Sequence, residues 1–131
     1  MNRGIEFHDS TVHAVRTAGG DAVVEMTVYV HSTAGRPGAD PGTGWYQRAE
    51  MVVAGAVLGQ NTPAAPLDLD DGVVTVDERF ENVVPLPFDR NGRVNVVLQG
   101  VGGSFRASGS GLRISLKGSP GQAEDFPGSA P

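Results

Sequence analysis

The segment Phe7-His8-Asp9-Ser10 places an imidazole beside a carboxylate and a hydroxyl, the groups that general acid–base and nucleophilic catalysis use. Neighbouring residues of a β-strand point to opposite faces, so His8 and Asp9 are poorly placed to act on one substrate atom. The segment instead favours a tight turn, in which Asp9 and Ser10 bond backbone N–H groups and His8 is half-buried. We therefore assign no catalytic residue.

The three histidines, His8, His13 and His31, are the remaining candidates for soft metal ligands, because the chain has no cysteine. A metal site needs side chains that converge, and these histidines show neither an H-x-H nor an H-x-x-x-H spacing. We expect surface or capping histidines, no metal and no cofactor.

The direction of the His13 side chain depends on the register of the first hairpin, which the sequence leaves open. If Thr17 pairs with Val23, His13 lies on the same outer face as Tyr29, but if Thr17 pairs with Ala22, His13 points inward. A shift of one residue decides between them, because side chains alternate between the two faces of a strand.

Residues 32–44 form a long segment rich in glycine and proline, without a strand pattern. Loops of this length inside a domain are more often functional or disordered than simple connections. Arg36 and Asp40 could form a charged pair, and Trp45 and Tyr46 offer aromatic surface of the kind that binding sites use. The alternative is a mobile excursion that Trp45 anchors to the core. The residues predicted to bind a ligand or a partner are His31, Arg36, Asp40, Trp45, Tyr46, Tyr29, His8 and Asp9.

Three carboxylates precede a glycine in Asp68-Leu69-Asp70-Asp71-Gly72, as in some calcium loops. An EF-hand needs a longer loop that ends in a glutamate and lies between two helices, and the sequence offers neither. We predict an Asp-Gly turn between two strands, with solvated carboxylates.

Size and composition indicate one soluble domain in a reducing compartment. The chain has 131 residues and no cysteine, which is typical of a single cytoplasmic domain. It shows no signal peptide and no apolar run of the roughly 20 residues that a membrane helix needs. The net charge of −5 disfavours binding to nucleic acid. The basic residues are arginines except for Lys117, which together with the many Ala, Gly and Val residues indicates a bacterial source.

Apolar and polar residues alternate along much of the chain, as Val24, Met26, Val28 and Val30 illustrate. Frequent glycines and prolines leave no window for a long helix. The predicted strands are residues 4–7, 11–17, 22–31, 45–58, 72–76, 79–84, 93–99, 104–108 and 112–117. We predict a single all-β domain over residues 1–117, an antiparallel sandwich or barrel of about nine short strands.

Glycine and proline also predict where the strands end. Asn91-Gly92 suits a two-residue hairpin turn, and Gly109-Ser110-Gly111 offers the same backbone freedom before the last strand. Pro85 and Pro87 cannot donate ladder hydrogen bonds, so their segment is expected at a sheet edge or a crossover.

Residues 118–131 contain one large apolar residue, Phe126. So little apolar surface cannot offset the entropy of ordering the backbone. We predict a disordered, solubilising tail.

The N-terminal apolar-x-Phe-His-Asp-Ser pattern, followed at once by a strand, resembles a motif of uncharacterised small bacterial β proteins. Some of these are similar to immunity-type proteins of toxin systems. The spacing near the C-terminus is similar to their last hairpin, at Leu98, Gln99, Gly100, Phe105, Gly109, Leu112, Ile114, Leu116 and Gly118. The resemblance implies an all-β fold and no catalytic residue.

Two classes of function remain. A non-catalytic protein-interaction module, of the immunity type or part of an assembly, fits an acidic chain that attracts a basic partner. The alternative is a small-ligand or carbohydrate-binding sandwich, enzymatic only if His8 or His31 meets a distant carboxylate such as Asp40, Asp77 or Glu81. We predict the first: a cytoplasmic module that binds a protein partner or itself, with a homodimer left open, and neither nucleic acid nor membrane.

Overall fold

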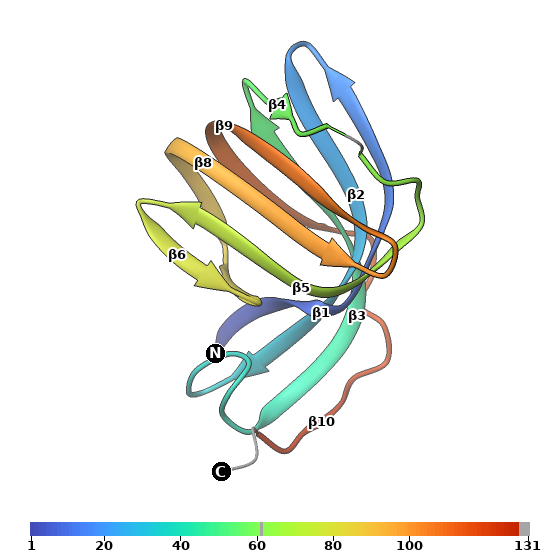
Figure 1. Ribbon diagram of the computed structural model, residues 1–131. Helices are drawn as coiled ribbons and strands as arrows, with labels where there is room; N and C mark the ends of the chain where they lie inside the picture. The colour runs from blue at the N-terminus through green and yellow to red at the C-terminus, as the bar shows by residue number, and fades with distance from the viewer. Residues whose placement is uncertain (61, 129–131) are drawn as a thin grey trace.

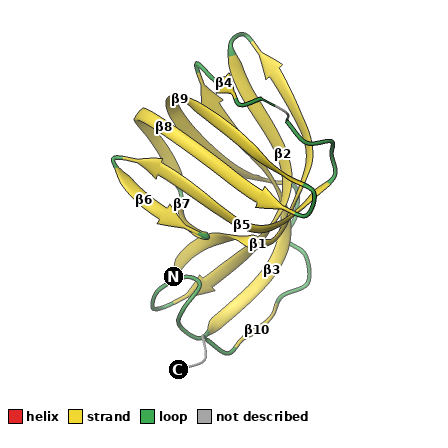
Figure 2. Ribbon diagram, viewed as in Figure 1, coloured by secondary structure: helices red, strands yellow, loops and turns green. Residues whose placement is uncertain are grey.

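The protein is described by a computed structural model that covers residues 1–60 and 62–128. These residues form antiparallel strands and no helix (Figures 1 and 2), which confirms the predicted all-β class. The strands are β1 (Asn2–Ala18), β2 (Asp21–Thr33), β3 (Gly42–Ala54), β4 (Val57–Leu58), β5 (Leu67–Val76), β6 (Glu78–Glu81), β7 (Val83–Leu86), β8 (Phe88–Gly100), β9 (Gly103–Lys117) and β10 (Glu124–Phe126).

Within the described residues, six of the strands close into a barrel in the order β1-β2-β3-β9-β8-β5, and β5 pairs back to β1. The seam between β1 and β5 is short, with Thr11 opposite Asp68 and Val12 opposite Leu67. β4 pairs with β9 and β6 pairs with β5, so both extend the barrel wall. The predicted sandwich or barrel is therefore a barrel.

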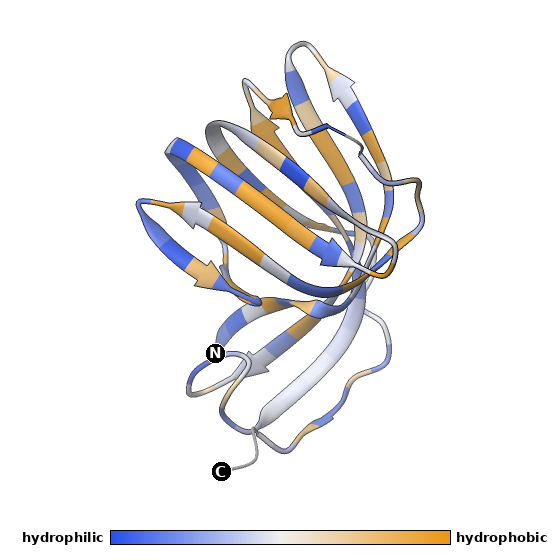
Figure 3. Cartoon of the chain, viewed as in Figure 1, coloured by the Kyte–Doolittle hydropathy of each residue, from blue (hydrophilic) through white to orange (hydrophobic). Residues whose placement is uncertain are grey.

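Alternate residues of the barrel strands fill its interior. Val24, Met26, Val28 and Val30 of β2 are all buried, as their spacing predicts. Phenylalanines of β1, β8 and β9 are the largest fully buried side chains, and Figure 3 shows apolar and polar residues alternating along β5 and β8. A barrel of six strands is narrow enough for side chains to fill its interior. The interior is therefore a packed core.

β1, β2 and β3 continue past the barrel as a smaller sheet, the lower part of Figure 1, which we call the extension. β7 pairs with residues 3–6 of β1, and β10 pairs with residues 42–44 of β3. Because β2 and β3 continue further than predicted, the loop between them shortens from residues 32–44 to residues 34–41. The extension carries most of the residues predicted to bind.

Three predicted turns were wrong, because the residues lie inside strands. Asn91-Gly92 belongs to β8, where Gly92 (φ 136°) lies in a bulge. Gly109-Ser110-Gly111 belongs to β9, and the acidic segment before Gly72 belongs to β5, with a register shift at Asp70. Hairpin turns and bulges both draw on the backbone freedom of glycine, so glycine alone does not distinguish them.

The prediction for the two prolines is confirmed. β7 contains Pro85 and, among the described strands, pairs with β1 alone, while Pro87 separates β7 from β8. The missing N–H groups therefore break no ladder inside the barrel.

The segment predicted as a disordered tail differs from that prediction at residues 124–126. These residues form β10 on the edge of β3, and the Phe126 ring packs on His31. The single large apolar residue of the segment, Phe126, thus finds a buried partner that composition does not reveal. Residues 129–131 of the predicted tail lie outside the described residues.

Gly72→Ala is expected to destabilise the protein by about 1–3 kcal/mol through overpacking. A Cβ at Gly72 would lie 2.5–2.9 Å from atoms of the buried Phe7 side chain, so the ring would have to shift. Urea unfolding measures the loss, with Thr75→Ala on the outward face of β5 as the control. Equal stability of Gly72→Ala and the native chain would contradict this packing.

Candidate functional site

A row of three side chains crosses the outer face of the extension. Glu6 of β1 lies opposite Tyr29 of β2, and Tyr29 lies opposite Tyr46 of β3. The two tyrosine rings pack edge to face, with centroids 5.2 Å apart and planes at 69°. Tyr29 is only 7% exposed and Tyr46 is 46% exposed, so Tyr46 is the member that a partner can contact most fully.

β10 places another carboxylate beside this row. The Tyr29 hydroxyl donates a hydrogen bond to Glu124 Oε1 at 3.1 Å, and Glu124 lies opposite Gly44 of β3. A Cβ at Gly44 would lie 1.9 Å from the Tyr29 hydroxyl oxygen and 2.3 Å from Cζ. The Tyr29 ring can therefore lie over Gly44 only because this residue has no side chain.

A loop within β1, directly after Glu6, carries His8 and Asp9. Ser10 ties this loop down: its hydroxyl donates to the Glu6 carbonyl at 2.5 Å and accepts from the Tyr29 N–H at 3.2 Å. Asp9 has a left-handed backbone (φ 70°), and its carboxylate lies 3.3 Å from His8 Nε2. Ser10 bonds a backbone N–H as predicted, but that of Tyr29 on β2 rather than one nearby in sequence. The Asp9 carboxylate contacts His8 instead of the predicted backbone N–H, and His8 is exposed rather than half-buried.

Burial and nearby negative charges raise the pKa values of both tyrosines. Burial raises the pKa of Tyr29 to about 12, and the hydrogen bond and charge of Glu124 contribute further. Burial raises the pKa of Tyr46 as well, followed by the charges of Asp9, Glu124 and Glu6. We call these five residues the acidic tyrosine face. It keeps its phenols neutral and presents a negative potential to a partner.

His31 lies two residues along β2 from Tyr29 and is fully buried. Its Nδ1 accepts a hydrogen bond from the Gly38 N–H at 2.5 Å, and its ring packs on Phe126 with centroids 3.9 Å apart. Its Nε2 has no hydrogen-bond partner among the described residues. Burial lowers the pKa of His31, against the opposing charge of Asp40. His31 thus holds the 34–41 loop and β10 together as a neutral ring.

The predicted charged pair of the loop is present. Asp40 Oδ2 accepts a hydrogen bond from the Arg36 N–H at 2.5 Å and lies 3.8 Å from Arg36 Nε. The Arg36 side chain is 84% exposed, so this ion pair contributes little stability. Asp40 acts mainly on the backbone of the loop, which it closes over His31.

Trp45 lies on the opposite face of β3 from Tyr46, because neighbouring strand residues alternate. Its Nε1 donates to Gln47 Oε1 at 2.9 Å, and its ring packs partly against the barrel core. The predicted binding residues are therefore divided: Tyr29, Tyr46 and Asp9 share the acidic tyrosine face, whereas Trp45 does not.

The three histidines have separate partners. The hairpin pairs Thr17 with Ala22, the register expected to turn His13 inward, but a bulge between Val12 and Ala14 reverses its direction. His13 Nε2 instead lies 2.7 Å from the Thr27 hydroxyl on the outer face. Within the described residues, no group of three His, Cys, Asp or Glu side chains is arranged to hold a metal ion.

Sequence reasoning missed Glu6 and Glu124 as members of the acidic tyrosine face. Glu6 alternates with the buried Ile5 and Phe7, so the strand pattern already placed it outside the core. Burial nevertheless raises its pKa, with His8 opposing and Asp9 adding to the effect. No local signal marks Glu124, because its position depends on β10 pairing with a strand far away in the sequence.

The chain matches no family model, no curated protein and no solved structure in the three comparisons made. Across the described residues, no helix is long and apolar enough to span a membrane.

The two tyrosines of the chain are expected to ionise late. Both pKa values lie above the ordinary 10.0, and that of Tyr29 lies at about 12. The phenolate absorbance of the folded protein should therefore rise mainly above pH 10.0, and Tyr29→Phe should remove the later part of the rise. A midpoint at the ordinary value would contradict the geometry of the row. The unfolded chain in denaturant serves as the control.

Acid is expected to destabilise the protein through His31. Its folded pKa lies below the ordinary 6.5, so below this pH the unfolded chain binds a proton that the folded chain does not. The contribution is complete above pH 6.5 and is lost as the pH falls toward the folded pKa. Thermal melts measure the slope, which His31→Phe should reduce and the exposed-site control His8→Gln should preserve. An unchanged slope in His31→Phe would assign the effect to other groups.

Proposed function

We propose that this chain is a non-catalytic protein-interaction module, which binds a partner with a basic surface through the acidic tyrosine face. The observation that supports this most is the environment of Tyr46. Its large, half-exposed side chain stands over the buried Tyr29 and among the charges of Glu6, Asp9 and Glu124. Tyrosine is enriched among the residues that dominate binding energy at interfaces.

The charge of the face suits a cationic partner. Carboxylates around an aromatic side chain attract Lys and Arg residues during encounter, and a guanidinium can stack on a tyrosine ring. The net charge of −5 acts in the same direction at longer range. The exposed Arg48 on β3 lies two residues from Tyr46, opposite Thr27, and therefore borders the face.

The same charge argues against self-association through this face. In a symmetric dimer the same patch would meet itself, so Glu6, Asp9 and Glu124 would face their own copies. A different, basic protein is the better fit, as for an immunity-type protein that covers its target, and we place this binding in the cytoplasm. The alternative ligand-binding site loses support, because Trp45 lies on the other face of the sheet from Tyr46 and His31 is buried under the loop.

Capture from bacterial lysate at increasing salt, compared across matched variants, tests the proposal. Tyr46→Ala and the double variant Glu6→Gln with Asp9→Asn should weaken retention of the same protein by about tenfold or more, which corresponds to about 1.4 kcal/mol. The controls are Val57→Ala and Asp89→Asn, two exposed positions on β4 and β8. The captured protein should be basic and released by salt.

Retention that is equal in all variants would place the interaction elsewhere. Retention of an acidic protein, unaffected by salt, would overturn the charge argument. Glu124 is left unchanged in the test, because its hydrogen bond to Tyr29 also holds β10 in place.

A further inference from the structure

The barrel is open at one end. β1 pairs with β5 only as far as Val12, and residues 14–18 of β1 pair with β2 alone among the described strands. On the other side of the barrel, the pairing of β3 with β9 ends at Ala54 opposite Gly111. Residues 59–60 and 62–66, the described part of the connection from β4 to β5, cross this opening. Gly59 attaches their start to β9 through a hydrogen bond from its N–H to the Arg106 carbonyl at 2.8 Å.

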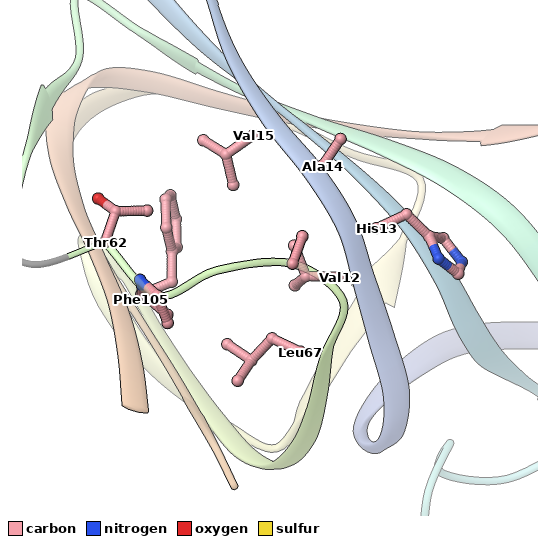
Figure 4. A pocket seen from close by; sticks show the side chains of 9 residues that line it. Val12, His13, Ala14, Val15, Thr62, Leu67 and Phe105 are labelled. Carbon is pink, nitrogen blue, oxygen red and sulfur yellow. The ribbon is translucent and has the colours of Figure 1, made fainter. Parts of the chain in front are cut away.

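A pocket of about 260 Å³ lies between this crossing segment and β1, and we call it the mouth pocket. In Figure 4, Val12, Val15, Leu67 and Phe105 point into a common space, whereas the His13 ring points away from it. The bulge at His13 explains this arrangement. It restores the alternation so that Val12 lies opposite Met26 and Val15 lies opposite Val24, both inward-facing residues of β2.

The lining of the mouth pocket contains no charged side chain among the described residues. His13 borders it, but its Nε2 is engaged with Thr27 on the outer face. Thr62 also lines the pocket, but in Figure 4 its methyl group rather than its hydroxyl points toward the common space. The β1 backbone beyond Val12 supplies polar groups at the rim. A carboxylate or an ammonium group would lose its water here without gaining a counter-ion.

The volume of the mouth pocket limits the size of a ligand. An apolar cavity of roughly 150 Å³ is enough to bind benzene. A pocket of about 260 Å³ therefore has room for a molecule of one or two rings. Mouths of β-barrels are also a common place for ligand sites.

We infer that the mouth pocket binds a small, uncharged, largely apolar compound of one or two rings, with a single polar atom toward the β1 edge. The apolar part contacts Val12, Val15 and Phe105, and the polar atom bonds the β1 backbone on the edge that faces away from β2. This site is separate from the acidic tyrosine face, because Val12 and Val15 of β1 face the barrel interior.

Calorimetric titration of the purified chain with indole and 2-naphthol tests this inference, with benzoate as the charged counterpart. Both neutral compounds should bind and should raise the melting temperature. The affinity for benzoate should be lower by about tenfold or more. Val15→Phe fills the pocket and should reduce the affinity for 2-naphthol by about tenfold or more. Val57→Phe, the same change at an exposed position on β4, should leave the affinity unchanged.

Val15→Ala provides a second test in case Val15→Phe does not fold. It enlarges the pocket and should shift the preference toward 2-naphthol over indole. Absence of binding by both neutral compounds, equal binding of benzoate, or full affinity in Val15→Phe would overturn the inference. Tyr46→Ala should bind these compounds as the native chain does, which separates this site from the proposed protein interface.

Discussion

The interruption of β1 between Glu6 and Thr11 is the constraint on which the rest of the structure depends. Before it, β1 pairs with β7 as part of the extension, and after it, β1 pairs with β5 and closes the barrel. Ser10 stabilises the interruption by donating a hydrogen bond to the Glu6 carbonyl, just before it, and by accepting one from the Tyr29 N–H on β2. Phe7, at the start of the interruption, points into the core beside Gly72. One strand can thus belong to two differently directed parts of the sheet.

Both candidate binding regions arise where β1 stops sharing the barrel with β5. On the N-terminal side, the outer face of β1, β2 and β3 carries Tyr46 among carboxylates. On the C-terminal side, the β1 edge beyond Val12 has no partner strand among the described residues, and the mouth pocket lies between it and residues 62–65. The filled interior between them excludes a deep central cavity. The two proposed sites therefore lie on one face and at one end of the molecule.

The 34–41 loop and β10 both contact one buried ring. His31 accepts a hydrogen bond from the loop through Nδ1 and packs on Phe126 of β10. With both segments in place, Glu124 reaches the Tyr29 hydroxyl and completes the acidic tyrosine face. Asp40, predicted from the sequence as a binding residue, instead accepts a hydrogen bond from the Arg36 N–H and so stabilises the backbone of the loop. The contacts of His31 with the loop and β10 and the contact of Tyr29 with Glu124 therefore start from neighbouring positions of β2.

The sequence alone determined the all-β class, the inward residues of strands such as β2, and the edge position of Pro85, because alternation and missing N–H groups are local properties. It did not distinguish a turn from a bulge at Asn91-Gly92, since both draw on the same glycine freedom. Only the tertiary structure decided that His13 turns outward, that Phe126 and Glu124 pack on β2, and that the barrel stays open beyond Val12. These features depend on which distant strands pair and in which register, and no local pattern encodes that choice.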